Sequence, residues 1–255
     1  MIKGDVIIGM GDVGKPFHEL LSQSGIKVRG IDLIEEKNYG DLIEPPIEIL
    51  HICFPYSPSF IEETVKEINR WKPSETVIHS TIKPHVTEEL QDIMDIPIIY
   101  SPIRGVHNRM ITDLKRYKKI FSAKEITKVK KYPKRLEEIG LEWETLSNPL
   151  TLEYAKILVD TTYYGWLIIY AQHTNEICLE ENIDFDEMWS FSEQIHKELG
   201  NRPKMYPGEG IGGKCVIQNT KLIEDEFIST VFNHDKQYRI NINKNNKSLK
   251  KRNGN

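Results

Sequence analysis

The stretch "DVIIGMGDVGK" at residues 5–15 decides the fold, because it joins an apolar strand to a glycine-rich turn and then to a helix. Its three glycines follow the pattern G-x-G-x-x-G. In such a turn the first glycine permits a tight bend, the second lets the backbone approach a pyrophosphate, and the third lets helix and strand pack closely. The phosphates then lie at the helix N-terminus. The predicted dinucleotide-binding residues of this turn are Gly9, Gly11, Asp12, Val13 and Gly14.

The acid that ends the second predicted strand indicates which dinucleotide is bound. The segment "IKVRGID" at residues 26–32 ends in Asp32. Asp32 stands about twenty residues after the glycine turn, where a carboxylate hydrogen-bonds a ribose 2′-hydroxyl and repels a 2′-phosphate. This favours NAD over NADP, although Arg29 in the same strand is a counter-signal. The alternative is a sheet of this kind that binds no cofactor.

Residues 1–148 alternate short apolar runs with helical stretches. We expect further strands at residues 47–55, 75–81, 96–102, 118–123 and 141–146. Helices are expected at 14–25, at 60–71 and, interrupted at Pro133, at 125–140. Alternation of strand and helix implies α/β class and a doubly wound parallel sheet. Residues 1–148 are therefore predicted to form a Rossmann-type NAD-binding domain.

The pattern changes after residue 148. One long apolar stretch at 149–181 predicts a connecting helix, and a further helix is expected at 186–199. The long helix is apolar nearly all the way round, which predicts burial on several sides. We expect residues 149–240 to form a small all-helical substrate and dimerisation domain. A homodimer through the long helix is expected, and a helix buried within its own monomer is the alternative.

The last residues differ in composition from the rest. Residues 241–255 carry five basic residues and no acid, which predicts a flexible basic tail or, alternatively, a functional basic arm. The whole chain has a net charge of -4, which gives no indication of a nucleic-acid partner.

Composition and cysteine usage indicate a cytoplasmic protein. No run of about 18 apolar residues occurs, so no membrane span is expected. The N-terminus runs directly into the first strand, unlike a signal peptide. The three cysteines are widely spaced, fit no zinc pattern and predict no metal site. A reducing cytosol is the default interpretation.

Two groups of residues in the second half carry candidate chemistry. The loop "PGEGIGGKC" at 207–215 ends in Cys215, which would be either a nucleophile or a small core residue. Lys156 and Asp160 are four residues apart on the long helix and share a face. A lysine near buried surface can donate a proton to a substrate oxygen, or hydrogen-bond to it. The alternative for this pair is a surface ion pair.

Five pieces of the chain resemble the UDP-glucose/GDP-mannose 6-dehydrogenase family. They are "GMGDVGKP", "HSTIKPH", "YSPIRG", "EYAKILVDTTYYGWLIIYAQHTNEIC" and "PGEGIGGKC", in the family's order. The resemblance implies that NAD oxidises a primary alcohol to an aldehyde, that Cys215 captures the aldehyde as a thiohemiacetal, and that a second hydride transfer leads to the carboxylate. It places Lys156 beside the developing oxyanion and Thr81 by the cofactor. The thiol chemistry is reasonable, because covalent capture keeps the aldehyde from escaping.

The remaining site residues follow the same resemblance. We expect Pro55, Ser80 and Thr81 to contact the cofactor. We expect the substrate to be contacted by Arg104, Lys156, Gly212 and Gly213.

The chain departs from the family at two kinds of position. Ile103 and His107 stand where the family has two acids, and His107 would replace the lost carboxylate as the group that activates water, or have no role. Asp160 stands where the family has asparagine, and Asn219 where it has aspartate. We hypothesise that Asp160 and Asn219 form a coupled pair.

The resemblance implies a third domain that closes over the sugar nucleotide, and we expect these 255 residues to hold no counterpart of it. Either the substrate is smaller, or a partner chain completes the pocket, or the alcohol belongs to another class. Two competing interpretations stay open. One is a single-step β-hydroxy-acid dehydrogenase that uses Lys156 without a cysteine nucleophile, with Arg104 holding a carboxylate. The other is a non-catalytic nucleotide-binding relative.

Four histidines and two cysteines receive no role from the sequence. His51, His79, His173 and His196 are scattered along the chain. Cys53 and Cys178 stand in apolar runs and are expected to be core residues.

Overall fold

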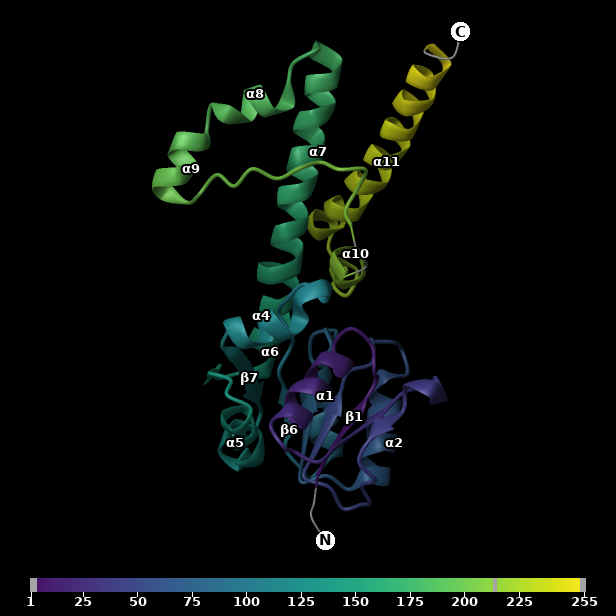
Figure 1. The fold of residues 1–255 in the computed structure, drawn as a ribbon, viewed down its shortest axis with the longest axis vertical. Coiled ribbons are helices and arrows are strands. Elements are labelled where there is room, and N and C mark those ends of the chain that lie inside the picture. The colour runs from purple at the N-terminus through teal and green to yellow at the C-terminus, as the bar shows by residue number, and fades with distance from the viewer. Residues whose placement is uncertain (1–3, 213–214, 253–255) are drawn as a thin grey trace. The chain divides into compact units, whose positions relative to one another are not determined.

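The structure is a computed structural model that describes residues 4–212 and 215–252, and it divides into two compact units (Figure 1). The first unit is Met1–Lys156 and the second is Ile157–Asn255. The domain limits expected after residues 148 and 240 stay predictions. No helix among the described residues is long and apolar enough to cross a membrane.

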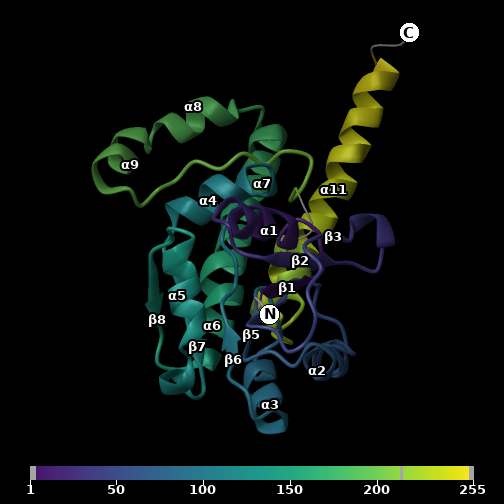
Figure 2. The same cartoon turned by 60° about the horizontal axis from the view of Figure 1, so that its bottom comes forward.

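An eight-stranded sheet forms the centre of the first unit, in the order β3-β2-β1-β4-β5-β6-β7-β8. Figure 2 turns the sheet so that β8 is found at one edge and β3 at the other. The five strands from β2 to β6 in this order are parallel, which confirms the predicted doubly wound sheet. The strand bounds are β1 Asp5–Ile8, β2 Val28–Ile31, β3 Tyr39–Gly40, β4 Ile49–Ile52, β5 Glu75–Ile78, β6 Ile98–Tyr100, β7 Lys119–Ala123 and β8 Trp143–Thr145.

The sheet is not parallel throughout, which corrects the prediction at its edges. Strand β3 pairs with β2, and β7 with β6, in antiparallel fashion, while β8 is parallel to β7. An apolar run in a sequence predicts a buried strand, but it does not indicate whether that strand runs parallel or antiparallel to its neighbours. Because β7 runs backwards, it begins at the edge where the parallel strands end.

Helices cover both faces of the sheet. On one face Phe17 and Leu114 pack with Leu136 in one apolar cluster, which places α1 (Gly14–Gln23), α4 (Met110–Arg116) and α5 (Lys131–Glu138) together. On the other face Phe60 and Leu90 pack with Leu152, from α2 (Phe60–Trp71), α3 (Val86–Ile93) and α6 (Pro149–Tyr154). This arrangement is the Rossmann-type architecture expected for the first half of the chain.

Helix α5 runs through Pro133, so the predicted interruption there is wrong. Pro133 lies in the first turn, where backbone N–H groups have no intrahelical partner and proline is tolerated. The N–H groups at this helix end are bound instead by Glu75, a buried carboxylate on β5. Glu75 accepts from the backbone amides of Lys130 (2.6 Å), Lys131 (2.8 Å) and Tyr132 (2.8 Å).

The second unit is helical. Residues 149–181 are helical throughout, as expected, but Ala155–Thr162 (η4) has the wide turns of a π-helix between α6 and α7 (Tyr163–Glu181). The helix predicted at 186–199 is instead two short helices, α8 (Phe185–Ser190) and α9 (Glu193–Leu199). The unit is completed by α10 (Cys215–Thr220) and α11 (Glu226–Arg252).

Helix α7 packs against α11, and it also contacts α10 and α8. Gly165 allows this approach, since a Cβ there would lie 2.7 Å from a side-chain carbon of Val231. Gln172 and Asn175, further along α7, donate to Asp235 and Tyr238 of α11. Within the single chain α7 is therefore only partly covered, and its burial on several sides stays a prediction. Its exposed large side chains are Tyr163, Tyr164, Tyr170, Ile177 and Leu179.

Residues 241–252 continue α11, where the sequence predicts a flexible basic tail. Once a helix exists, each added residue gains one hydrogen bond, so propagation is much easier than nucleation. A composition rich in lysine is therefore compatible with helix here.

The buried Glu75 cap leads to a stability prediction. We expect Glu75→Ala to lower the free energy of unfolding by about 1–3 kcal/mol, because three amides at the start of α5 lose a buried acceptor. Glu142→Ala, at an exposed glutamate just before β8, is the control and should change stability by less than about 0.5 kcal/mol. Urea unfolding followed by circular dichroism measures both. Equal stabilities for the two variants would contradict the capping role.

Candidate functional site

The cofactor residues predicted from the sequence gather at the carboxyl ends of β1, β4 and β5. The glycine turn follows β1, Pro55 follows β4, and Ser80 and Thr81 follow β5. The hydroxyl of Ser80 donates to the carbonyl of Phe54 at 2.6 Å, which joins two of these loops. In open sheets of this kind, ligands bind outside the carboxyl ends of the strands, where strand order reverses.

The three glycines of the turn differ in what requires them. Gly9 has φ +95°, and a Cβ there would lie 2.7 Å from the backbone nitrogen of Phe54. A Cβ on Gly14 would lie 1.9 Å from the carbonyl oxygen of Gly9. A Cβ on Gly11 would meet nothing within 4 Å. The fold therefore needs Gly9 and Gly14, whereas the open space at Gly11 suits the close approach of a ligand.

The start of α1 fits a phosphate. The N-cap residue of this helix, the half-buried Val13, makes no side-chain hydrogen bond to the helix end, and the neighbouring Asp12 is exposed. The N–H groups of a first helical turn need acceptors from outside the helix, and a phosphate is a suitable one. The turn and the helix end together fit the diphosphate of a dinucleotide.

Asp32 is held beside the glycine turn by backbone donors. Its carboxylate accepts from the amides of Met10 (2.7 Å) and Ile34 (3.2 Å). Burial acts to raise the pKa of Asp32, but the Ile34 and Met10 amides and the charge of Lys37 more than offset it, so the pKa lies below its usual range. An ionised carboxylate has about four acceptor positions, so Asp32 can also accept from ribose hydroxyls.

The segment after β6 presents an arginine and no acid. Ile103 is buried in the core cluster, whereas Arg104 is half-buried, donates to the carbonyl of Lys118 and lies over the ring of Tyr117. His107 begins the short helix His107–Arg109 (η2), and its side chain lies outside the described residues.

A buried acid that the sequence did not indicate fixes this segment. Asp113 of α4 accepts from the amide of Val106 (3.0 Å) and from Nε of Arg109 (2.9 Å). These two donors hold the pKa of Asp113 below its usual range. The carboxylate therefore determines the path of the chain around His107.

Lys156 is the last residue of the first unit and is half-buried. Three residues earlier, the buried Glu153 accepts from the amides of His85 (2.7 Å) and Thr87 (3.0 Å) and from the Thr87 hydroxyl (2.6 Å). Burial nevertheless raises the pKa of Glu153. Glu153 thus anchors α6, the helix that leads into Lys156, to the N-terminus of α3.

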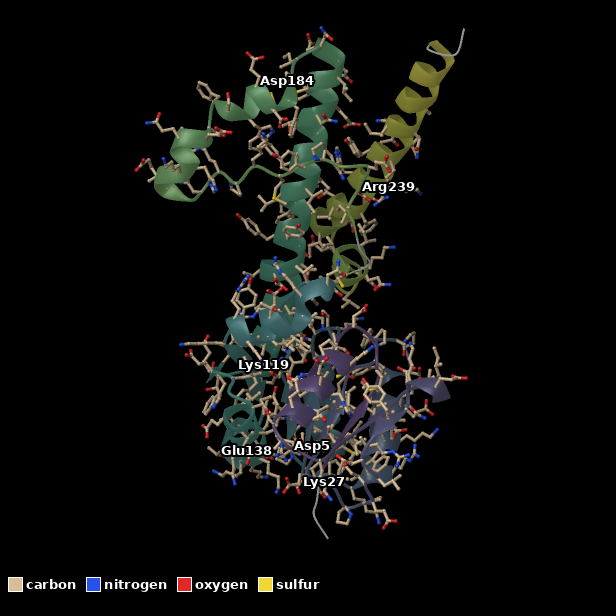
Figure 3. All side chains as sticks on the ribbon, viewed as in Figure 1. Asp5, Lys27, Lys119, Glu138, Asp184 and Arg239 are labelled. Atoms are coloured by element: carbon tan, nitrogen blue, oxygen red, sulfur yellow. The ribbon has the colours of Figure 1, made fainter. Side chains whose placement is uncertain are left out.

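The glycine-rich loop is held against α11 by one buried carboxylate. Asp235 accepts from the amide of Ile211 at 2.6 Å and from the side-chain amide of Gln172 at 2.9 Å. Arg239, one turn further along α11, donates to Asp235 (2.8 Å) and to the carbonyl of Ile211 (2.7 Å). Figure 3 labels Arg239 on this helix. The sequence indicated the loop but not this clamp.

The loop glycines explain how the backbone fits so closely. Gly208 and Gly210 have φ of +54° and +145°, which favour glycine. A Cβ on Gly210 would lie 2.2 Å from the guanidinium carbon of Arg239. The carbonyl of Gly208 accepts from the Tyr238 hydroxyl at 3.2 Å. Gly212 is exposed, and a Cβ there would meet nothing within 4 Å; Gly213, also assigned to substrate, lies outside the described residues.

Exposure separates the three cysteines. Cys215 is exposed and begins α10, whereas Cys178 is buried and its Sγ donates to Sδ of Met188 at 3.7 Å. Cys53 keeps some exposed surface, but burial of its thiol raises the pKa to about 12, with Lys119 acting in the opposite direction. Cys215 is therefore the accessible thiol, as a nucleophile requires.

Asp160 and Asn219 both belong to the second unit. Asp160 is exposed within η4, and Asn219 is half-buried on α10. Their coupling stays a hypothesis.

Two of the histidines described as scattered lie side by side. Nδ1 of His51 and Nε2 of His79 are 3.0 Å apart in the core of the first unit. Lys119, at the start of β7, is buried close to them and donates to the carbonyls of Ser101 (2.7 Å) and Pro102 (3.0 Å). Burial, assisted by the charges of Lys156 and Arg104 and opposed by Cys53, holds the pKa of Lys119 well below its usual range.

Comparison with known proteins supports the resemblance drawn from the motifs. No family model matches the chain. A curated relative, UDP-N-acetyl-D-mannosamine dehydrogenase of Methanococcus vannielii, is 25% identical over 265 residues, which cover 84% of this chain and 60% of the relative. The chain thus spans less than two thirds of that relative's length.

Solved structures share the fold at low sequence identity. UDP-D-ManNAc dehydrogenase from Pyrococcus horikoshii matches with a TM-score of 0.77 and 16% identity, over 92% of this chain and 68% of that one. 3-Hydroxyisobutyrate dehydrogenase from Mycobacterium tuberculosis matches with a TM-score of 0.68 and 12% identity, over 91% of both chains. These structures confirm the Rossmann-type fold, and the 25% identical curated relative supports the resemblance to nucleotide-sugar dehydrogenases.

The difference between the glycines leads to a paired prediction. We expect Gly11→Ala to fold with an unchanged melting temperature, because the new methyl group meets no protein atom within 4 Å, and to bind NAD at least about tenfold more weakly, because the methyl group occupies the space expected for the pyrophosphate. Gly14→Ala should instead lower the melting temperature, because its Cβ collides with the Gly9 carbonyl. Thermal denaturation and calorimetric NAD titration measure these effects. An undiminished NAD affinity in a folded Gly11→Ala variant would contradict this interpretation.

Proposed function

We propose that the protein is an NAD-dependent oxidoreductase that oxidises a primary alcohol of a sugar nucleotide or a related sugar. The observation that carries this proposal is the glycine turn, in which the fold demands two glycines and leaves Gly11 open to a ligand. The name of the 25% identical relative, a UDP-N-acetyl-D-mannosamine dehydrogenase, supports the substrate class. The chain spans only 60% of that relative's length, so the relative's substrate class is carried over to this chain as a proposal.

The choice of NAD over NADP rests on Asp32. Backbone donors keep this carboxylate ionised beside the glycine turn, where it would bind a ribose hydroxyl and repel a phosphate. Leu33 and Ile34 follow directly and are both exposed, so they offer apolar surface to an adenine ring. When bound, NAD supplies the acceptor for hydride.

The first oxidation converts the alcohol to an aldehyde. The alcohol loses a hydride to the cofactor and its hydroxyl proton to a base. In our proposal Lys156 steadies the developing negative charge on the substrate oxygen, and Thr81 lies by the reacting carbon. A buried or half-buried lysine suits this role, because an ammonium interacts more strongly with an oxyanion away from bulk water.

The second oxidation uses Cys215. Its thiolate would add to the aldehyde carbon and, with a proton taken up on the oxygen, form a thiohemiacetal. Release of that hydroxyl proton to solvent and of a second hydride to a second NAD would leave a thioester. Water then cleaves the thioester, releasing the carboxylic acid and restoring the thiol. We propose that His107 activates this water, because Ile103 is buried and supplies no carboxylate. Asp160 and Asn219 are proposed to assist as a pair.

A single-step reaction on a β-hydroxy acid is the second candidate, and Arg104 favours it. This arginine follows the buried Ile103, and its guanidinium carries five N–H donors, of which the Lys118 carbonyl takes one. A guanidinium binds a carboxylate in a planar fork, so Arg104 would hold the acid group of such a substrate. Lys156 would then act alone, and Cys215 would have no chemical role.

Replacement of Cys215 distinguishes these candidates. In the four-electron reaction, Cys215→Ala should abolish carboxylate formation, because no thiohemiacetal can form, while the first NADH equivalent persists at a reduced rate. In the single-step reaction, the variant should retain NADH production close to the parent rate. NADH absorbance and chromatographic product analysis, with nucleotide sugars, sugar phosphates and hydroxy acids as substrates, provide the readout.

Gln218→Ala is the matched control for this experiment, because Gln218 is an exposed residue of the same short helix. It should leave both products unchanged. If the parent protein binds NAD and yet forms no NADH with any of these alcohols, the protein is a non-catalytic relative and both enzymatic candidates fail.

We propose that the protein forms a homodimer through α7. Its aromatic side chains Tyr163, Tyr164 and Tyr170 are exposed in a single chain. Contiguous exposed apolar surface of this kind marks interaction sites, and tyrosine is enriched at interfaces.

Sedimentation tests this dimer. At micromolar concentration the parent should sediment as a dimer, and Tyr170→Glu should shift it towards monomer, because a charge would be buried without a partner. Glu181→Lys, at an exposed residue near the end of the same helix, is the control for a change in surface charge. A monomeric parent would refute the proposal.

A further inference from the structure

In the first unit, a row of hydrogen-bonding groups crosses the buried sheet from Asp5 on β1 to Ser101 after β6. Oδ2 of Asp5 lies 3.5 Å from Nε2 of His51, and Nδ1 of His51 lies 3.0 Å from Nε2 of His79. Nδ1 of His79 lies 3.1 Å from the carbonyl oxygen of Ser101. All four side chains are at most 1% exposed. Figure 3 labels Asp5 and Lys119 in this unit. Asp5 stands at one end of the row, and Lys119 contacts the Ser101 carbonyl at the other end.

The carbonyl at one end determines the direction of every hydrogen bond in this row. A carbonyl oxygen can only accept, so Nδ1 of His79 must carry the proton and donate to Ser101. Burial lowers the pKa of both imidazoles, so each ring is neutral and carries one N–H. Nε2 of His79 is then an acceptor, and Nδ1 of His51 must donate to it. Nε2 of His51 is left with a lone pair facing Asp5.

The opposite direction would create a worse contact. If Nε2 of His51 carried the proton, His79 would have to donate from Nε2 and would turn an unprotonated Nδ1 towards the Ser101 carbonyl at 3.1 Å. At the other end the distance to Asp5 is 3.5 Å, and that Asp5 oxygen is already paired with Nε of Arg135 at 2.7 Å. The structure therefore favours the direction in which the shorter contacts are hydrogen bonds.

His79 connects two segments that the proposed function assigns to ligands. It directly precedes Ser80 and Thr81, and its carbonyl accepts from the amide of Ile103 at 3.3 Å. Its side chain holds the Ser101 carbonyl, three residues before Arg104. Both the backbone and the ring of His79 thus join the loop after β5 to the loop after β6.

We propose that His79 is a positioning residue: its Nδ1–H, directed by His51, fixes the Ser101 carbonyl and so sets the loop that carries Arg104 relative to Ser80 and Thr81. The consequence for catalysis rests on the proposed function, whereas the direction of the hydrogen bonds does not. Lys119 completes the arrangement, because its Nζ donates to the same carbonyl from the start of β7.

Groups on every neighbouring element bear on the protonation of this pair. Asp5 of β1 favours a proton on His51, while Arg135 of α5 and Lys119 of β7 oppose it. The remaining neighbours are Phe17 of α1 and Tyr132 of α5, whose rings contact both imidazoles, together with Cys53 after β4 and Glu48, which pairs with Arg135. Burial and the two cations outweigh Asp5, so the pair is neutral near pH 7.

Nitrogen NMR of the histidine rings tests the direction directly, with or without activity. In protein labelled with ¹⁵N, the His79 ring should show a protonated Nδ1 and an unprotonated Nε2 at pH 7.5, and His51 should show the same tautomer. Assignment comes from His51→Asn and His79→Asn. A protonated Nε2 on His79 would overturn the proposal even if the enzyme proved active.

Paired substitutions test the positioning role. In asparagine the side-chain nitrogen replaces Nδ1 of histidine, so His79→Asn keeps the donor to Ser101, whereas His79→Leu removes it. We expect His79→Leu to raise the substrate KM by about fivefold or more, the equivalent of one ordinary hydrogen bond, and His79→Asn to stay within about twofold of the parent. His51→Asn and His51→Leu should differ in the same way. Equal KM values for folded Leu and Asn variants would overturn the proposal.

Stability against pH supplies a readout that needs no substrate. A histidine whose pKa is lowered by folding contributes stability that is present above the unfolded value near 6.5 and is lost as the pH falls through the folded value. The parent should therefore lose stability as the pH falls below about 6.5. His51→Asn should reduce this loss, because one of the lowered groups is gone, and an unaltered pH dependence would contradict the buried neutral pair.

Discussion

The second unit depends on the carboxylate of Asp235. This one side chain accepts from the loop amide of Ile211, from Gln172 on α7 and from Arg239 on its own helix. Ordering a glycine-rich backbone is entropically expensive, because glycine has more conformations to lose than any other residue. Residues 201–212, the described part of the loop before Cys215, form no strand or helix, so the contacts from α11 supply hydrogen bonds to this backbone.

Three buried carboxylates in the first unit likewise fix the backbone around them by accepting its hydrogen bonds. Glu75, Glu153 and Asp113 are buried acids, each of which accepts from backbone amides at the start of a helix or in a loop. A buried carboxylate is costly unless such donors surround it, so each of these acids restricts the local backbone to the conformation that satisfies it. The sheet supplies the framework, and these acids determine where its connecting segments lie.

Much of the fold follows from local sequence pattern, and its failures have local causes. The strands of the parallel sheet appear as apolar runs, because both faces of the sheet are covered. The direction of a strand cannot be predicted from such a run, since the sequence of β7 would be apolar in either direction. The two-residue β3 is too short to show a period. The helices around Pro133 and at 241–252 differ from the expectation because proline is tolerated in a first helical turn and because an existing helix propagates easily into a lysine-rich segment.

The candidate site, like the fold, can be predicted from the sequence only in part. The glycine turn, Asp32 and the loop before Cys215 are recognisable because the residues that act together are close in sequence or stand at a fixed spacing. The supporting residues are not recognisable. Ile211 and Asp235 are 24 residues apart, and Glu153 is 66 residues from Thr87. A single buried acid in a sequence has no periodic signature, so only the folded structure shows what it binds.

The buried histidine pair restricts how this sequence can change over evolutionary time. Replacing one ring with a hydrocarbon leaves a nitrogen of the other without a partner in the core, whereas replacing both removes the unsatisfied groups together. Positions 51 and 79 should therefore vary jointly among related sequences, although 28 residues separate them in the chain. A lineage that loses the pair must cross an intermediate of lower stability, or first acquire an amide at one of the two positions.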